Sequence, residues 1–130
     1  MRGEPGHDIV PELYPRVDEP VIDKPMRCAF AHTDLDLLLR NRGVKNLIIC
    51  GLTTDVCVFS TLKSAIDHEY DCLLVRDACA AASEDLHEMV VKSIQMEGGI
   101  AGAVAACEDV VSAVLFWAGP EKEVYRESIG

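Results

Sequence analysis

One cysteine stands where a strand passes into a helix, and it is the residue best placed for chemistry. Cys57 lies in the first turn of a predicted helix, after the apolar run 47–50 and the glycine-containing turn 51–54. The free amides and the dipole at the start of a helix stabilise a thiolate. Because the thiolate is the nucleophilic form of cysteine, this position predicts that Cys57 acts as a nucleophile.

Lys24 is a second candidate, because it ends the short apolar segment 21–23, which predicts a strand that Pro25 stops. An ammonium near Cys57 would favour its thiolate by charge attraction. A lysine beside a proline can equally be a solvated surface charge, and spacing alone leaves both alternatives open. We expect the remaining cysteines to be reduced and to fill space as small apolar side chains: Cys28, Cys50, Cys72, Cys79 and Cys107.

Strands and helices alternate along the chain, and this alternation must position both candidates. Runs that are apolar on both faces, such as 47–50, fit parallel strands covered by helices. We therefore expect an α/β fold, a Rossmann-like parallel sheet with helices on both faces and right-handed crossovers. Ligands bind such sheets at the carboxyl ends of the strands, where Lys24, Cys57 and Asp77 fall. The expected strands are 44–50, 72–75 and 100–103, and the expected helices begin near 33, 55, 83 and 108.

Local signals predict finer details of these elements. Thr33 and Ser83 are expected to cap the helices that begin there, because their hydroxyls can accept bonds from free amides. Residues 77–82 are expected to form a loop. The core face of the helix that begins near residue 55 is expected to present Val56, Phe59, Leu62, Ala65 and Ile66.

Composition limits the class of protein. The 130 residues are 49% hydrophobic and 26% charged, which suits one globular domain at 21–118, preceded by a proline-rich arm or loop at 1–20 and followed by a polar tail at 119–130. The net charge of −10 argues against nucleic acid and anionic membrane surfaces as partners. No apolar run approaches the roughly 20 residues that span a bilayer, and no signal peptide pattern opens the chain. We expect a cytoplasmic protein.

Residues 51–58, Gly-Leu-Thr-Thr-Asp-Val-Cys-Val, resemble the signature of the isochorismatase-like cysteine hydrolases. Other segments resemble this family and occur in the order in which the family has them: Ile22-Asp23-Lys24 and Phe30 upstream, and Val75-Arg76-Asp77-Ala78 downstream. The resemblance extends from about residue 3 to residue 114. This family includes nicotinamidases, N-carbamoylsarcosine amidohydrolases and ureide hydrolases, so the resemblance implies the isochorismatase-like fold.

The resemblance also implies roles for individual residues. The family triad is Asp-Lys-Cys, in which Lys24 matches the lysine and Cys57 the cysteine. The family has a cis peptide bond before the cysteine, which by position would join Leu52 to Thr53. The amides of Thr53 and Cys57 would then form the oxyanion hole. Phe30 either lines the substrate pocket or belongs to the core, and the sequence leaves this open.

One part of the family pattern has no counterpart. The triad aspartate follows the family's first strand, whereas Asp8, Asp18 and Asp23 follow no apolar strand. We therefore expect the family's first strands to be missing and catalysis to fall by about 10²–10⁴-fold. The metal ligands of the nicotinamidase branch belong to the same missing region, so no metal and no cofactor are expected. The histidines are expected to be isolated, and solvated or supporting: His7, His32, His68 and His87.

The sequence thus favours a cysteine hydrolase that cleaves an amide, ureide or related C–N bond of a small molecule through a thioester on Cys57. Two alternatives stay open, an inactive binding or interaction module of the same fold and a vinyl ether hydrolase of the isochorismatase type. A redox-sensing thiol is a further alternative. Because strand edges would be exposed, we also expect a homo-oligomer.

Overall fold

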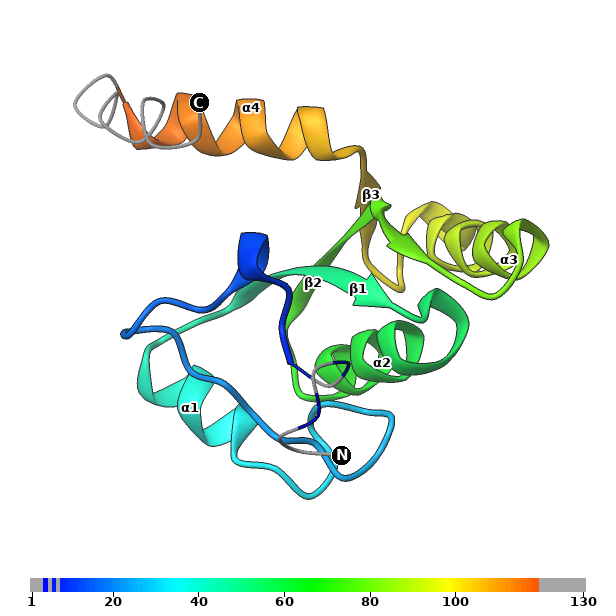
Figure 1. Ribbon diagram of the computed structural model, residues 1–130. Coiled ribbons are helices and arrows are strands. Elements are labelled where there is room, and N and C mark those ends of the chain that lie inside the picture. Colours follow the sequence, from blue (N-terminus) through cyan, green and yellow to red (C-terminus); the bar gives the residue numbers. More distant parts are fainter. Residues whose placement is uncertain (1–3, 5, 7, 120–130) are drawn as a thin grey trace.

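The computed structural model describes residues 4, 6 and 8–119 of the chain. A parallel sheet of three strands, in the order β1-β2-β3, forms its centre (Figure 1). The predicted parallel α/β fold is confirmed. The strands are β1 (Asn46–Leu52), β2 (Asp71–Ala80) and β3 (Ala103–Ala105).

Within the described residues, four α-helices and three short helical segments connect and extend these strands. The α-helices are α1 (Leu35–Asn41), α2 (Phe59–Asp67), α3 (Glu84–Gln95) and α4 (Cys107–Ala118). The short segments are the 3-10 helices η1 (Pro11–Leu13) and η3 (Met96–Gly98) and the π-helical segment η2 (Thr54–Val58). The predicted tail lies outside the described residues, apart from Gly119.

The predicted caps differ in their outcome. The Ser83 side chain accepts a hydrogen bond from the Leu86 amide, so the cap of α3 is confirmed. The helix expected to begin at Thr33 begins at Leu35 instead. The Thr33 hydroxyl nevertheless accepts a hydrogen bond from the Leu35 amide at 3.3 Å, and it donates one to the Ala29 carbonyl at 2.5 Å.

β1 and β2 change register part-way along their length. Asn46–Ile49 pair with Asp71–Leu74, whereas Gly51 pairs with Cys79 and Leu52 with Ala80. Four residues of β2 therefore lie opposite Cys50, which is an enlarged β-bulge. The prediction of a loop at 77–82 was wrong over 77–80, because that part of β2 pairs with the end of β1.

β3 begins three residues later than expected, after a glycine-rich turn. Gly102 has a φ of +112°, and a Cβ at this position would lie 2.8 Å from the Cys72 carbonyl oxygen. The close approach to β2 therefore requires glycine there. Immediately beyond it, Ala103 pairs with Leu73.

The core lies where α2 and α3 pack with β2. Leu62, Ala65, Leu74 and Ile94 are fully buried, which confirms the inward positions predicted for Leu62 and Ala65. Val56 was wrongly predicted to face the core and is 40% exposed. It belongs to η2, whose wider π-helical turn changes which side chains face inward.

Much of the apolar surface around β1 and α4 is uncovered. β1 alternates between half-buried and exposed residues, so the expectation that 47–50 are buried on both faces was wrong; Ile48 is 54% exposed. The exposed residues alternate along β1, which means that one face of this strand is uncovered in the described chain. Figure 1 shows α4 extending away from the sheet, and its Phe116 and Trp117 are 91% and 88% exposed.

Two further expectations fail. Cys50 on β1 and Cys107 on α4 are exposed rather than buried, while Cys72 on β2 is buried as predicted. The segment 21–23 forms no strand, because it has no neighbouring strand with which to pair. None of the helices within residues 8–119 combines the length and the apolarity needed to cross a membrane.

Candidate active site

Cys57 lies in η2, immediately beyond the carboxyl end of β1, and its side chain is half-buried. The Thr53 carbonyl accepts hydrogen bonds from the amides of Val56 at 3.3 Å and Val58 at 3.0 Å. These two amides flank Cys57 in the sequence. The turn that carries the thiol is therefore held by its own backbone at the end of the sheet where ligands of parallel α/β proteins bind.

The residues just before Cys57 contain an unusual backbone feature. The peptide bond between Leu52 and Thr53 is cis. Among the turn and loop hydrogen bonds of the described residues, none uses the Thr53 amide. Thr53 and Cys57, the two residues assigned to the oxyanion hole, thus lie four residues apart around one turn.

Lys24 lies on an exposed, irregular segment. Its Nζ donates a hydrogen bond of 3.1 Å to the Met26 carbonyl. No hydrogen bond or ion pair within the described residues joins Lys24 to Cys57. The catalytic role that the family resemblance gives to Lys24 stays a prediction, and in this arrangement the ammonium is exposed to solvent. The physical reason is that segment 21–23 is not held in the sheet, so the sheet does not direct the lysine towards the turn.

A buried polar pair lies beside the nucleophile turn. Thr54 Oγ1 and His87 Nδ1 are joined by a hydrogen bond of 2.9 Å, and the residues are 0% and 7% exposed. The expectation that His87 is isolated was therefore wrong. A signal was present in the sequence, because His87, Val90, Val91 and Ile94 follow the spacing of one buried helix face.

Asp55 is a second residue of the turn that sequence reasoning missed. Its Oδ1 atom is buried and has no hydrogen-bond partner among the described residues. Buried carboxylate oxygens ordinarily accept at least one hydrogen bond.

A cavity of about 270 Å³ lies at the carboxyl half of β2 and the start of α3. Burial raises the pKa of the Cys79 thiol above its ordinary value, which disfavours the thiolate form of that residue. Asp77 Oδ1 accepts a hydrogen bond of 2.7 Å from the Cys107 amide, so this carboxylate holds the start of α4. The residues around the cavity are Arg76, Asp77, Cys79, Ala80, Ala81, Ser83, Glu84 and His87.

A larger cavity, of about 590 Å³, lies at the opposite end of β2. Its lining includes Asp71 and Cys72, the first two residues of that strand, together with the turn around Gly99. Parallel sheets bind ligands at the carboxyl ends of their strands rather than at the amino ends. The larger cavity is therefore not part of the candidate active site.

Phe30 belongs to the core. Its ring stacks on His68 with centroids 5.0 Å apart and lies 5.9 Å from the ring of Tyr70. It lines neither of the two cavities described above. Of the two roles considered for Phe30, the core position is the one that the structure supports.

The other histidines lie apart from Cys57. His68 Nδ1 hydrogen-bonds to the Ser64 carbonyl at 2.7 Å, His32 is exposed, and His7 lies outside the described residues. Within the described ranges, no three His, Cys, Asp or Glu side chains gather so that they could hold a metal ion.

Known proteins resemble the chain in both sequence and structure. The isochorismatase domain family matches residues 1–106. The uncharacterized isochorismatase family protein YddQ of Bacillus subtilis is 37% identical over 86 residues, which are 66% of this chain and 48% of that protein. The ureidoacrylate amidohydrolase RutB of Acinetobacter baylyi is 37% identical over 89 residues, 68% of this chain and 36% of that protein. The chain thus spans half or less of these relatives.

Several solved structures resemble this chain in fold. An isochorismatase-like hydrolase from Alkaliphilus metalliredigens matches with a TM-score of 0.78 at 34% identity, covering 85% of this chain and 60% of that one. A cysteine hydrolase from Pseudomonas syringae pv. phaseolicola matches with a TM-score of 0.78 at 29% identity, covering 85% of this chain and 56% of that one.

Proposed function

Because the chain belongs to the isochorismatase family, we propose that it cleaves an amide, ureide or related C–N bond of a small molecule with Cys57 as the nucleophile. One observation carries the proposal: a half-buried thiol lies in the turn beyond β1, at the carboxyl end of a parallel sheet. The similarity to a ureidoacrylate amidohydrolase and to a cysteine hydrolase supports the same reaction class.

The proposed reaction proceeds through a thioester. The Cys57 thiolate attacks the substrate carbonyl carbon and forms a C–S bond, and the carbonyl oxygen takes up the negative charge. When the carbonyl re-forms, the C–N bond breaks and the nitrogen leaves as ammonia or an amine after accepting a proton. Water then attacks this thioester, or the thiocarbamate that a ureide gives, releases a carboxylic or carbamic acid and regenerates the thiol.

The amides of Thr53 and Cys57 are proposed to stabilise the oxygen that becomes charged. Both belong to one turn, and the Thr53 amide makes no turn or loop hydrogen bond within the described residues. An oxyanion donor of this kind typically lowers the barrier by about 3 kcal/mol.

Lys24 is proposed to stabilise the thiolate once its side chain turns towards Cys57. Its present bond to the Met26 carbonyl is exposed to solvent. An ordinary hydrogen bond contributes only about 0.5–1.5 kcal/mol net. The attraction of a nearby thiolate can therefore replace it.

The family resemblance gives the role of proton acceptor for the thiol to an aspartate, and the described aspartates upstream of Cys57 include Asp8 and Asp18. Asp8 Oδ1 accepts a bond from the Ile9 amide, and Asp18 pairs with Arg16 at 3.4 Å, so both carboxylates have local partners. Acid-base assistance commonly contributes about 10²–10⁴-fold to a rate. We propose that these 130 residues alone convert substrate more slowly, by that factor, than a chain that has an aspartate side chain next to the Cys57 thiol.

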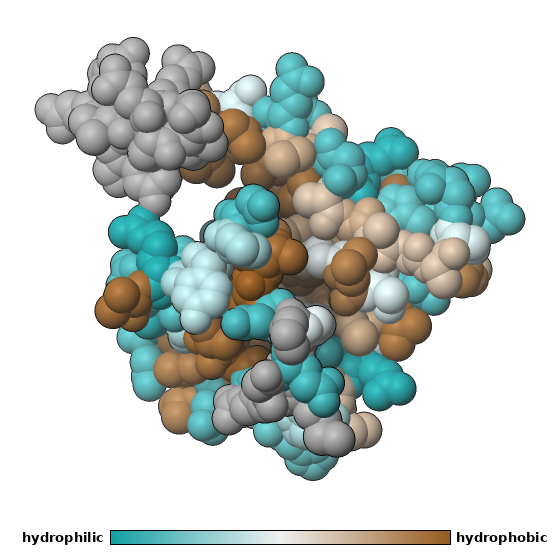
Figure 2. Space-filling model, in the orientation of Figure 1, coloured by the Kyte–Doolittle hydropathy of each residue, from teal (hydrophilic) through white to brown (hydrophobic). Residues whose placement is uncertain are grey.

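Self-association is also part of the proposal. Figure 2 shows the side of the molecule seen in Figure 1, and apolar surface lies in its middle, in the region where Figure 1 places the strands. The exposed side chains on β1 and α4 include Ile48, Leu52, Phe116 and Trp117. Exposed apolar surface and an unpaired strand edge both favour association.

An ammonia-release screen over amides and ureides tests the catalytic role. Wild-type protein is compared with Cys57→Ala and with Cys107→Ala, which removes an exposed thiol from α4. We expect release that is abolished in the Cys57 variant and unchanged in the Cys107 variant. Equal release by the wild type and the Cys57→Ala variant would refute Cys57 as the nucleophile.

A further inference from the structure

We propose that Thr54 and His87 position the turn that carries Cys57, an inference that rests on the function proposed for that cysteine. Thr54 begins η2 and lies three residues before Cys57. Its hydroxyl and the His87 Nδ1 atom are 2.9 Å apart. These are positioning residues, because they would act on the reaction through the turn rather than by touching substrate.

Because this hydrogen bond is buried, losing it would be costly for both side chains. Thr54 is fully buried and His87 is 7% exposed, so water can replace neither partner easily. A buried polar group that loses its partner retains the cost of its desolvation. Each side chain therefore holds the other in one arrangement.

His87 is a firm anchor because its helix is held at both ends. Ser83 caps the first turn of α3 through the Leu86 amide, and the His87 amide donates to the Ser83 carbonyl at 3.2 Å. Further along the same face, Val90 and Ile94 are buried in the core. The imidazole thus projects from a helix that packing already fixes.

Thr54 transmits this anchoring to the turn through the backbone. Its carbonyl accepts a hydrogen bond from the Phe59 amide, beyond Cys57. The preceding carbonyl, of Thr53, accepts the amides of Val56 and Val58 on either side of Cys57. A shift of Thr54 would therefore move both ends of the turn. Misplacement of a reacting group by about 1 Å can cost about 100-fold in rate.

Site-resolved alkylation of the full chain with iodoacetamide tests this role. Thr54→Val removes the hydroxyl with little change of shape, and Thr54→Ser keeps it. His87→Leu removes the ring nitrogen, and His87→Asn keeps a polar group near the Nδ1 position. Peptide mass spectrometry then gives the alkylation rate of each cysteine separately. The alkylation rate of exposed Cys107 shows whether the reagent is equally active in each sample, and that of buried Cys72 shows whether the fold is intact.

We expect Cys57 to react about tenfold or more slowly in Thr54→Val and His87→Leu. The Thr54→Ser and His87→Asn variants should recover most of the wild-type rate, and Cys107 and Cys72 should not change in any variant. A wild-type rate at Cys57 in Thr54→Val and His87→Leu would overturn the positioning role and leave the proposed function intact. Faster labelling of Cys72 that parallels every loss at Cys57 would also overturn it, since the pair would then only support the fold.

A different result would count against the proposed function itself. If wild-type Cys57 reacted no faster than Cys107, the turn would not hold an activated thiol. The positioning role would then fall with it. The wild-type rate therefore distinguishes the two failures before any variant is compared.

Discussion

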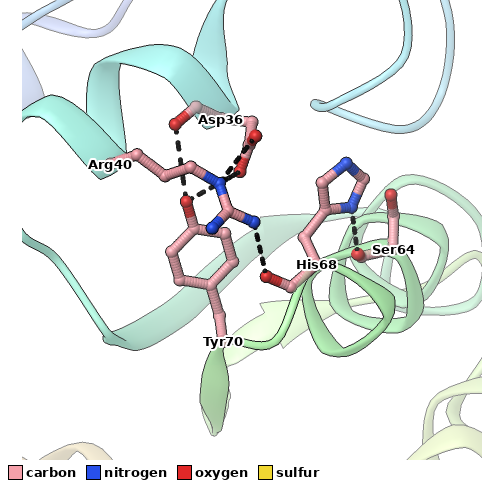
Figure 3. A network of polar contacts seen from close by, with 5 residues as sticks. All are labelled: Asp36, Arg40, Ser64, His68 and Tyr70. Carbon is pink, nitrogen blue, oxygen red and sulfur yellow. Dashed lines mark hydrogen bonds and ion pairs between the residues drawn. The ribbon is translucent and has the colours of Figure 1, made fainter.

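The Tyr70 hydroxyl donates a hydrogen bond of 2.8 Å to Asp36 Oδ1, and so joins α1 to the start of β2 (Figure 3). Arg40 lies 3.0 Å from the same carboxylate and donates to the His68 carbonyl at 3.0 Å. No residue of α1 is fully buried. This polar group therefore attaches the helix that precedes β1, together with Leu35 and Leu39, which pack against the core.

The Asp36 network predicts a loss of stability in acid. The hydrogen bond from Tyr70, with help from Arg40, lowers the pKa of Asp36 below 3.8. A carboxylate with a lowered folded-state pKa adds stability above its unfolded pKa, and that stability is lost as the pH falls through the folded value. Urea unfolding should therefore show the contribution in full above about pH 5 and a decline below pH 4.

Asp36→Asn should flatten that decline, and Asp34→Asn is the matched control, because the Asp34 side chain makes no capping bond. Identical pH profiles for the wild type and the Asp36→Asn variant would contradict the account.

The start of α4 should depend on a carboxylate from β2. Asp77→Ala removes the acceptor of the Cys107 amide and should weaken this helix start by about 1 kcal/mol. Hydrogen exchange at the Cys107 amide should then be several-fold faster. Asp77→Asn keeps the Oδ1 acceptor and should exchange much as the wild type does. Unchanged exchange in Asp77→Ala would mean that other contacts hold the helix.

The elements of the fold could largely be predicted from the sequence, because their signals are local. The run at 47–50, the hydroxyl of Ser83 and the helical spacing of Leu62 and Ala65 each act within a few residues. The cis bond between Leu52 and Thr53 was expected from the family pattern, and the structure has it there. The turn with Cys57 also lies where the sequence predicts it, beyond a parallel strand.

The positions that could not be predicted depend on partners distant in sequence. The extension of β2 to Ala80 arises from pairing with Gly51 and Leu52, and the partner of the His87 imidazole, Thr54, lies 33 residues away in the sequence. The strand expected at 21–23 does not form, because this segment has no neighbouring strand with which to pair. Local patterns carry no information on such long-range pairings.

Self-association should depend on the end of α4. Replacing Phe116 and Trp117 together by serine removes two apolar side chains that are 91% and 88% exposed. Sedimentation velocity should show the wild type above the monomer mass of 14.2 kDa and the double variant closer to it. Leu37→Ser, at an exposed site on α1, is the control and should behave as the wild type does. A monomeric wild type would refute the oligomer.

The most direct measurement is the detection of the acyl group on the enzyme. Tryptic cleavage after Lys45 and Lys63 places Cys50 and Cys57 in one peptide, so Cys50 serves as an internal control. After incubation with an amide or ureide and rapid acid quenching, tandem mass spectrometry should locate the added acyl mass on Cys57. Addition to Cys50 at the same level, or an unmodified peptide during measurable ammonia release, would contradict a thioester mechanism at Cys57.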